Sequence, residues 1–522
     1  MVGRSAMREP TLVADAAVPP RARAAGAVAA PELALLLAVT AIAVALRAGG
    51  LTFQGLEGDE GYSIALAQRS FADMLALFGY EANGTLYSLL LWPLSRIDDS
   101  LAMLRAPAAA AGTLAVPALW WALRPLAGRA AALVAALALA VAPYAVLYSQ
   151  YARAYGFVVL FAALAVGALV RALADPGRRL WWGAFAAATV LLAYSNALAP
   201  VYLGAAELAI VLLLAGPARI GRWLRWLVVA ALFCLPLLTA LIVERSRRDP
   251  LYWLEAPGLR GLKDAAARFG VGAWDAPGIA DYAPVGAAIV GLALLVVLGR
   301  VGRDVLVALA WSTLPVLACF ALSFLTPLLT PYYAIVALPG LCALLGVLAA
   351  RLPLVAGVAL VLVALAFFAA GTRWQRSHPV LSDLRAATAA WRSEQRPGDT
   401  LLVDVIQVLP ALGHYDPALR ATDGAYVVEE WGDRPLPPRV LGLDDPGGYS
   451  DPPAGPPSPA LVARHATGGR RLFVLFNEWT SRLQGDALHT AGIGWARAHC
   501  RVSERTFNRV DFLVIAGCPR TA

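Results

Sequence analysis

The feature that most constrains this chain is a series of long apolar segments. About 20 mostly apolar residues are enough for a helix to cross a lipid bilayer, and the 522-residue sequence contains eleven such segments. Hydrophobic residues make up 59% of the chain and charged residues 15%, whereas a soluble domain has about half and about a quarter. We therefore predict a polytopic α-helical membrane protein, and we exclude a soluble enzyme, a disordered chain and a disulfide-rich scaffold. The segments are 32–49, 102–123, 130–148, 155–173, 181–197, 199–215, 224–243, 283–299, 304–324, 331–349 and 353–371.

The arginines between these segments predict the orientation, because cytoplasmic loops carry an excess of basic residues. If residues 1–31 form a disordered cytoplasmic tail, the inner loops hold eleven arginines and the three short outer loops hold one, Arg153. The N-terminus is then inside, and the loops 50–101 and 244–282 lie outside. The surplus of positive charge lies before residue 376, which favours membrane orientation over nucleic acid binding. The inner arginines are Arg124, Arg129, Arg171, Arg178, Arg179, Arg219, Arg222, Arg225, Arg300, Arg303 and Arg351.

The last 150 or so residues have a different character, with shorter hydrophobic runs of strand length and a helix-like stretch at Ser382–Glu394. We predict a transmembrane domain over 32–373 and an outer α/β domain over 376–522. The segment 433–459 repeats Pro, Gly and Asp, which is typical of a loop or lid. The predicted strands are Thr400–Val405, Ala425–Val428, Arg471–Phe476 and Phe512–Ala516.

The cysteines show no spacing typical of metal ligands. Cys500 and Cys518 lie on flanking predicted strands in what we expect to be an oxidising compartment, so a disulfide and two free thiols are equally good interpretations.

Two adjacent carboxylates, Asp59 and Glu60, follow the first apolar segment between Gly58 and Gly61. Charges at a membrane face cost free energy unless they are paired, hydrated or used. Taken alone, the pair could simply cap the helix that the next apolar residues predict. The alternative is that one carboxylate acts as a general base. The two could also hold a divalent ion, although two neighbouring carboxylates alone make a poor metal site.

Arg153 stands against the positional bias of the other loop arginines. A planar guanidinium binds phosphate oxygens in bidentate fashion, and Gln150 and Tyr155 lie beside it in the sequence. The alternative is that Arg153 reaches toward lipid headgroups. A second group of arginines in the loop 244–282 is either a solvated charge run or a further source of phosphate ligands: Arg245, Arg247 and Arg248.

Together these residues resemble the GT-C superfamily of membrane glycosyltransferases. The closest branch is that of the protein O-mannosyltransferases and the lipid A aminoarabinose and galacturonosyl transferases. The resemblance covers residues 32–350. It lies in the Asp-Glu pair, a turn before a Leu-Tyr helix, Ser149–Tyr155 reading SQYARAY, and a Tyr-Tyr pair followed by Leu338-Pro339-Gly340.

The resemblance implies a sugar transferred from a polyprenyl-phosphate donor to a glycan, lipid or protein acceptor outside the membrane. It implies Asp59 as the catalytic carboxylate, with Glu60 beside it. The residues that it places at the donor phosphate or sugar are Gln150, Arg153, Tyr155, Tyr332 and Tyr333, and those at the acceptor or sugar are Glu81, Asn83 and Tyr87.

Two departures from the family pattern affect this assignment. Asn83-Gly84-Thr85 stands where many relatives have His-Pro-Pro before the Leu-Tyr helix. Pro331 stands where many have arginine, which removes one phosphate ligand that the arginines of the second outer loop could replace.

The chemistry needs no nucleotide site, and the sequence contains no P-loop or dinucleotide fingerprint. With one base and no second carboxylate placed as a nucleophile, single displacement with inversion is the simplest expectation. The main alternative function is a transporter or flippase of lipid-linked sugars, although such proteins place ionisable groups near the middle of the bilayer. A receptor or scaffold without activity is a third alternative.

Overall fold

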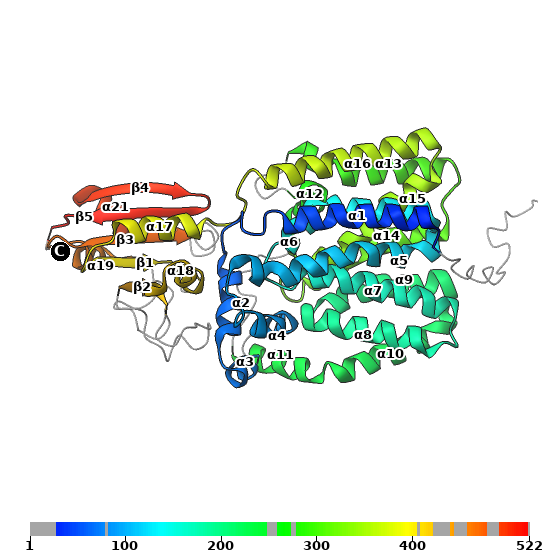
Figure 1. Ribbon diagram of the computed structural model, residues 1–522, viewed down its shortest axis with the longest axis horizontal. Helices are drawn as coiled ribbons and strands as arrows, with labels where there is room; N and C mark the ends of the chain where they lie inside the picture. Colours follow the sequence, from blue (N-terminus) through cyan, green and yellow to red (C-terminus); the bar gives the residue numbers. More distant parts are fainter. Residues whose placement is uncertain are drawn as a thin grey trace, which may run out of the picture.

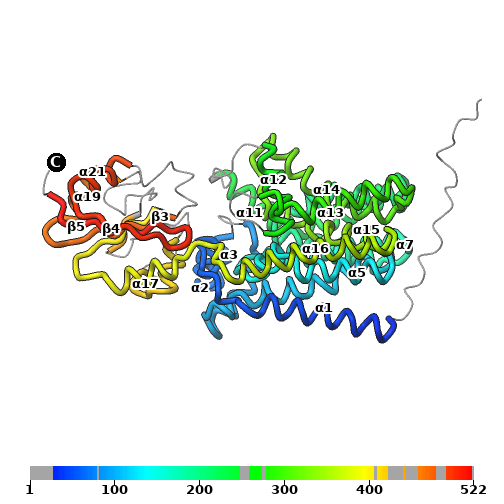
Figure 2. Tube along the Cα trace, turned by 90° about the horizontal axis from the view of Figure 1, so that it is seen from above, coloured from blue at the N-terminus to red at the C-terminus, as the bar shows by residue number. Residues whose placement is uncertain are grey.

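The computed structural model describes residues 28–78, 82–247, 258–272, 278–404, 408–420, 439–442, 457–477 and 490–519. A bundle of helices occupies one end of an elongated molecule, and a sheet domain occupies the other (Figure 1). The view turned by 90° shows the same end-to-end arrangement, with the chain passing from the last bundle helix directly into the sheet domain (Figure 2). The predicted cytoplasmic tail lies almost entirely outside the described residues.

Every apolar segment predicted from the sequence is largely helical, although 331–349 begins with a turn and a 3₁₀ helix, η3 (Ala334–Ala337), before α15. In lipid no water is available to bind the backbone N–H and C=O groups, so these groups form hydrogen bonds with one another within a helix. The corresponding helices are α1 (Ala30–Ala48), α5 (Leu101–Val141), α6 (Pro143–Ser149), α7 (Tyr155–Ala174), α8 (Arg179–Ser195), α9 (Ala199–Ala215), α10 (Ile220–Phe233), α11 (Leu235–Arg247), α13 (Ala283–Val297), α14 (Arg303–Leu322), α15 (Leu338–Arg351) and α16 (Leu354–Gln375).

The number of membrane crossings is less well determined than the helices themselves. By length and composition, seven helices among the described residues can cross a membrane, or eight if α10 and α11, bent by 66°, form one span. The range of α5 includes the predicted segment 102–123 and the first part of 130–148. Gly128 lies between them, and its φ of 85° and ψ of 179° interrupt the helix. Helices α8 and α9 have 17 residues each. The chain is a multi-pass membrane protein, and the count of eleven spans and the orientation stay predictions.

The first long loop folds into three helices at the end of the bundle that faces the sheet domain (Figure 1). They are α2 (Gly58–Gln68), α3 (Phe71–Leu77) and α4 (Thr85–Leu94). The Ser70 hydroxyl caps α3 by accepting a hydrogen bond from the backbone N–H of Asp73. Gly84 precedes α4 with a φ of 78°, a left-handed conformation that glycine adopts readily.

The C-terminal domain is a five-stranded mixed sheet in the order β2-β1-β3-β5-β4. Strands β1, β2 and β3 are parallel to one another, and β5 pairs antiparallel with β3 and β4. Three predicted strands are present, and Ala425–Val428 lies outside the described residues. Strands β2 and β4 were not predicted, because one has three residues and the other is mostly exposed. The strands are β1 (Thr400–Val403), β2 (Val440–Gly442), β3 (Arg471–Asn477), β4 (Arg501–Phe507) and β5 (Val510–Ala516).

Helices cover both faces of this sheet. On one face, α17 (Leu384–Glu394) and α18 (Leu409–Tyr415) pack on alternate residues of β1, β3 and β5, and on the other face α19 (Pro459–His465) and α21 (Ala491–His499) pack on the residues between them. Cys500 and Cys518 form a disulfide beside this second core. The segment 433–459 lies largely outside the described residues.

The core on the α17 and α18 face continues into the helical bundle. The same apolar cluster that holds Leu384 and Trp391 also holds Leu56 and Ile64 from the first loop and Leu104 from the start of α5. The sheet domain is therefore joined to the first loop by a shared core and not only by the chain that links them.

Candidate active site

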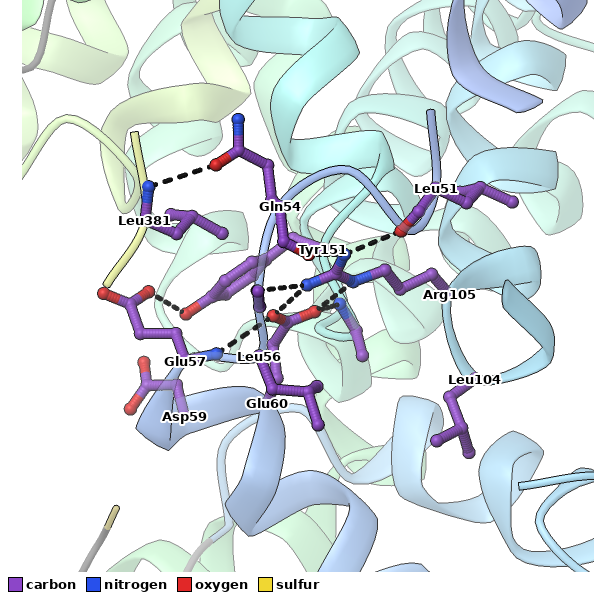
Figure 3. Close-up of polar contacts among 12 residues, drawn as sticks. Leu51, Gln54, Leu56, Glu57, Asp59, Glu60, Leu104, Arg105, Tyr151 and Leu381 are labelled. Carbon is purple, nitrogen blue, oxygen red and sulfur yellow. Dashed lines mark hydrogen bonds and ion pairs between the residues drawn. The ribbon is translucent and has the colours of Figure 1, made fainter. Parts of the chain in front are cut away.

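Asp59 lies in the first turn of α2, where the bundle meets the C-terminal domain. Its side chain is exposed, and it makes no hydrogen bond or ion pair with the residues that the structure describes. Figure 3 shows the carboxylates of Glu57 and Asp59 pointing to the same side of the turn, while Glu60 points to the opposite side, toward Arg105. Three carboxylates within four residues thus face different surroundings.

Glu60 is fully buried and its two oxygens are occupied. Arg105 donates from Nε to Oε1 at 2.7 Å and from Nη2 to Oε2 at 2.5 Å. The backbone N–H of Ala152 donates to Oε1 at 2.6 Å, and that of Glu57 donates to Oε2 at 3.3 Å. The Glu57 contact closes the N-terminal turn of α2, so Glu60 takes part in capping this helix, as one interpretation of the pair expected, and Asp59 does not.

Arg105, from α5, binds the turn that carries Asp59 and Glu60. It was not singled out from the sequence. Besides its two bonds to Glu60, it donates to the carbonyl oxygens of Leu51, Gln54 and Gly55 at 2.7–2.9 Å. Its side chain is 0% exposed. The available signal was a lone arginine inside a predicted membrane-spanning segment, since a charge in such a place needs a partner.

Glu57 is half-buried beside the 149–155 segment, and the Tyr151 hydroxyl donates to its Oε2 at 2.6 Å. Burial raises the pKa of Glu57 to about 7; the hydrogen bond from Tyr151 opposes this rise, and the charges of Asp59 and Glu60 add to it. The pKa of Tyr151 lies well above its usual value because of burial and then of the same three carboxylates. Tyr151 therefore stays a hydrogen-bond donor at neutral pH.

The predicted phosphate-binding segment lies against α2. The Arg153 guanidinium donates from Nη1 to the Ser63 hydroxyl at 3.3 Å, and this hydroxyl donates to the carbonyl oxygen of Asp59 at 3.2 Å. The contact of Arg153 with Ser63 thus lies one helical turn along α2 from Asp59. Gln150 instead closes the end of α1, because its Nε2 donates to the carbonyl oxygens of Leu46 and Arg47, both at 3.0 Å.

Tyrosines from two distant parts of the chain form an aromatic cluster beside this segment. The ring centroids of Tyr155 and Tyr332 are 5.7 Å apart, and those of Tyr332 and Tyr333 are 5.1 Å apart. The ring of Tyr155 also lies 6.1 Å from Tyr151, the residue that contacts Glu57. The structure therefore brings Tyr155, Tyr332 and Tyr333 together next to the carboxylate turn.

Several other predicted residues take different positions. Tyr87 is buried, and its hydroxyl donates to the carbonyl oxygen of Leu104 at 2.6 Å, which leaves it no face for a substrate. Asn83 accepts a hydrogen bond from the backbone of Ala197 at 3.4 Å. Arg245 is exposed near the end of α11. The side chain of Arg247, and Glu81 and Arg248 altogether, lie outside the described residues.

The carboxylate pair does not fit a metal ion. Both oxygens of Glu60 are occupied by Arg105 and by backbone donors, so Asp59 would be the only ligand from the pair. Within the described residues there is no group of three or more His, Cys, Asp or Glu side chains that could hold an ion.

No family model and no curated protein sequence matches the chain. The chain is similar in structure to ArnT from Cupriavidus metallidurans, with 14% identity over 94% of this chain and 100% of that chain and a TM-score of 0.56. ArnT bound to undecaprenyl phosphate matches with 15% identity over 94% and 99% of the two chains and a TM-score of 0.52.

The oligosaccharyltransferase AglB from Archaeoglobus fulgidus, in complex with an inhibitory peptide and a dolichol-phosphate, is also similar. It shares 10% identity over 94% of this chain and 74% of that chain, with a TM-score of 0.50. At these identities the likeness is one of fold: the chain shares the fold of ArnT and AglB, in agreement with the resemblance seen in the sequence motifs.

Proposed function

We propose that the protein transfers a sugar, a hexose or a pentose, from a polyprenyl-phosphate donor to an acceptor hydroxyl at the outer face of the membrane. The observation that carries this proposal is the carboxylate of Asp59, which has no partner among the described residues. It lies at the end of the bundle, one helical turn from the Arg153 contact at Ser63. The fold supports it as well, because ArnT binds undecaprenyl phosphate and AglB binds dolichol-phosphate.

In this mechanism Asp59 accepts the proton of the acceptor hydroxyl while the hydroxyl oxygen attacks the anomeric carbon. The bond between that carbon and the phosphate oxygen breaks, and the polyprenyl phosphate departs with the electron pair. Arg153 stabilises the negative charge on the leaving phosphate, and the tyrosine cluster provides a surface for the sugar or the phosphate. A single displacement of this kind inverts the anomeric carbon.

The sequence motifs predict that Glu60 acts beside Asp59 as a catalytic carboxylate, and the proposal gives it a positioning role instead. A carboxylate that already accepts four hydrogen bonds is a poor base, because protonating it would disrupt a buried ion pair. We assign it to positioning: it fixes the first turn of α2 and therefore the direction of Asp59.

The turn and the C-terminal domain share an apolar core and therefore lie on the same side of the membrane. The proposed side is the outer one, with a cytoplasmic N-terminus, because the loop arginines predict this orientation. The acceptor is then a glycan, lipid or protein of the cell envelope.

The transporter or flippase alternative is not favoured. In the described part of the spans, Glu207 is buried in α9 and accepts a hydrogen bond from the Trp223 indole at 3.2 Å, so a side chain of the bundle already binds it. Asp59, which has no partner among the described residues, lies instead at the end of the bundle, where the proposed transfer takes place.

Replacing Asp59 with Asn tests the proposal, because the change keeps the shape of the side chain and removes its basicity. Sugar transfer by the purified protein should fall by roughly two or more orders of magnitude, while binding of the donor lipid persists. Asp73→Asn, an exposed carboxylate in the same loop, is the matched control and should behave like the parent. Parent-level transfer by Asp59→Asn at equal expression would exclude Asp59 as the base.

A further inference from the structure

We infer that the C-terminal domain is part of the catalytic machinery, because it holds the turn that presents Asp59, with Tyr415 as a positioning residue. This inference rests on the proposed function. A separate outer domain supplies neither base nor donor site, and its natural role would be to shape access for the acceptor. The contacts between the domain and the turn lead to a different division of roles.

The first contact is made by Gln54, which comes just before the turn and is buried. Its Oε1 accepts hydrogen bonds from the backbone N–H groups of Leu381 at 3.3 Å (Figure 3) and of Val380 at 2.9 Å. Its Nε2 donates to the carbonyl oxygen of Gln375 at 3.1 Å. One side chain thus ties the turn to the segment through which the chain enters the C-terminal domain.

The second contact comes from α18 inside the domain. The backbone N–H of Leu56 donates to the Tyr415 hydroxyl oxygen at 2.7 Å. Leu56 is 0% exposed, so water does not reach it readily, and without Tyr415 its N–H would lose its partner. Since Leu56 lies three residues before Asp59, this bond fixes the backbone just before the first turn of α2, which carries Asp59 and which we call the catalytic turn.

The third contact lies just beyond Asp59, where α2 and α18 touch at Gly61. A Cβ atom added to Gly61 would lie 2.7 Å from the backbone N of Ala411, closer than such atoms approach in real structures. Any larger residue would therefore push the two helices apart. The domain consequently contacts the turn on both sides of Asp59, at Gln54 and Leu56 before it and at Gly61 after it.

A displacement of the turn changes the position of the base relative to the donor, and a misplacement of about 1 Å can cost about 100-fold in rate. The inference therefore predicts a specific defect. Variants at this contact should bind the donor normally and transfer slowly, because Arg153 and the tyrosine cluster come from other parts of the chain.

Two variants of the full-length protein test this, each with a matched control. Tyr415→Phe removes only the hydroxyl that Leu56 uses; Tyr282→Phe is its control, because the Tyr282 hydroxyl makes no hydrogen bond with the described residues. Gly61→Ala adds one methyl at the contact; Gly204→Ala is its control, because an added Cβ there meets nothing within 4 Å. The measurements are kcat, KM for the acceptor, and the amount of polyprenyl phosphate bound per mole of protein.

We expect Tyr415→Phe and Gly61→Ala to lower kcat by about tenfold or more, with an unchanged stoichiometry of bound polyprenyl phosphate. The two controls should match the parent. A loss that only reflected misfolding would reduce stoichiometry and rate together, and this result in Tyr415→Phe would overturn the positioning role. If Gly61→Ala does not fold, Tyr415→Phe alone decides.

The outcomes also separate this inference from the proposed function. If Asp59→Asn is inactive while Tyr415→Phe and Gly61→Ala transfer sugar at the parental rate, the function stands and the inference is wrong. If Asp59→Asn is fully active, the proposed base is wrong, whatever the other variants do.

Discussion

The buried ion pair between Arg105 and Glu60 should make a large contribution to the stability of the catalytic turn. Replacing Arg105 with Met removes five hydrogen bonds: two to the Glu60 carboxylate and three to carbonyl oxygens of the preceding loop. It leaves Glu60 buried, with only two backbone N–H donors. Removing one partner of a buried pair typically costs about 3–5 kcal/mol, much of it from the charge left behind. We expect Arg105→Met to lower the free energy of unfolding by an amount in that range.

A double-mutant cycle separates the pair from its surroundings. Glu60→Gln should also cost several kcal/mol, because it leaves the Arg105 guanidinium buried without its counter-charge. The double variant should lose less than the sum of the two single losses, with a coupling energy of about 0.5–3 kcal/mol. The assay is unfolding by SDS in mixed micelles, beside sugar transfer at the same protein concentration.

The chain offers an internal control for this cycle in the Arg505–Glu394 pair, whose N–O distance is 2.7 Å and whose side chains are 43% and 35% exposed. Solvent-exposed pairs contribute about 0–1 kcal/mol, so Arg505→Met should have a small effect. If Arg105→Met costs no more than Arg505→Met, or if the two single losses simply add, the reasoning from burial is refuted.

Two further predictions concern the surroundings of Asp59. Arg153→Lys should impair transfer clearly, because an ammonium group cannot bind a phosphate in the bidentate manner of guanidinium; equal rates for Lys and Arg, with an inactive Ala variant, would show that charge alone is needed. Glu57 has a pKa raised from 4.5 to about 7, so its contribution to stability is full below pH 4.5 and is lost as the pH rises through 7. Because Glu57 is only half-buried, we expect the free energy of unfolding to fall by about 1–3 kcal/mol over this pH range. Glu57→Gln should not show this loss of stability with pH. The measurement is the unfolding midpoint of both proteins at pH 5 and pH 8, and an equal shift in the two proteins would contradict the prediction.

The helices of the bundle could be predicted from the sequence because an apolar segment of sufficient length has a single favourable structure in lipid. The Asp59–Glu60 pair could be predicted as a candidate site for a related reason, because a charge beside an apolar run needs a partner or a function. Arg105 was missed because its role depends on Glu60, 45 residues away in the sequence. A linear pattern shows that a charge is present and does not show what it pairs with.

The contact of the C-terminal domain was harder still to predict. Gly61 and Ala411 are small residues without a distinctive signal, and the hydroxyl of Tyr415 binds a backbone N–H, which every residue except proline provides. Such contacts depend on the shape of two folded parts. The strand β4 was missed for a physical reason of its own, since an edge strand with exposed polar residues lacks the hydrophobic run that marks a buried strand.

The three carboxylates of the turn have the same chemistry and acquire different roles from their surroundings. Glu60 is buried against a guanidinium and two backbone donors, which stabilise its charge and occupy its lone pairs, so it can hold a structure together and cannot readily accept a proton. Glu57 is half-buried against a tyrosine hydroxyl, and its raised pKa leaves it partly protonated at neutral pH. Asp59 alone is both exposed and without a partner among the described residues. A general base must have a free lone pair and access to substrate before catalysis begins, and of the three only Asp59 has both.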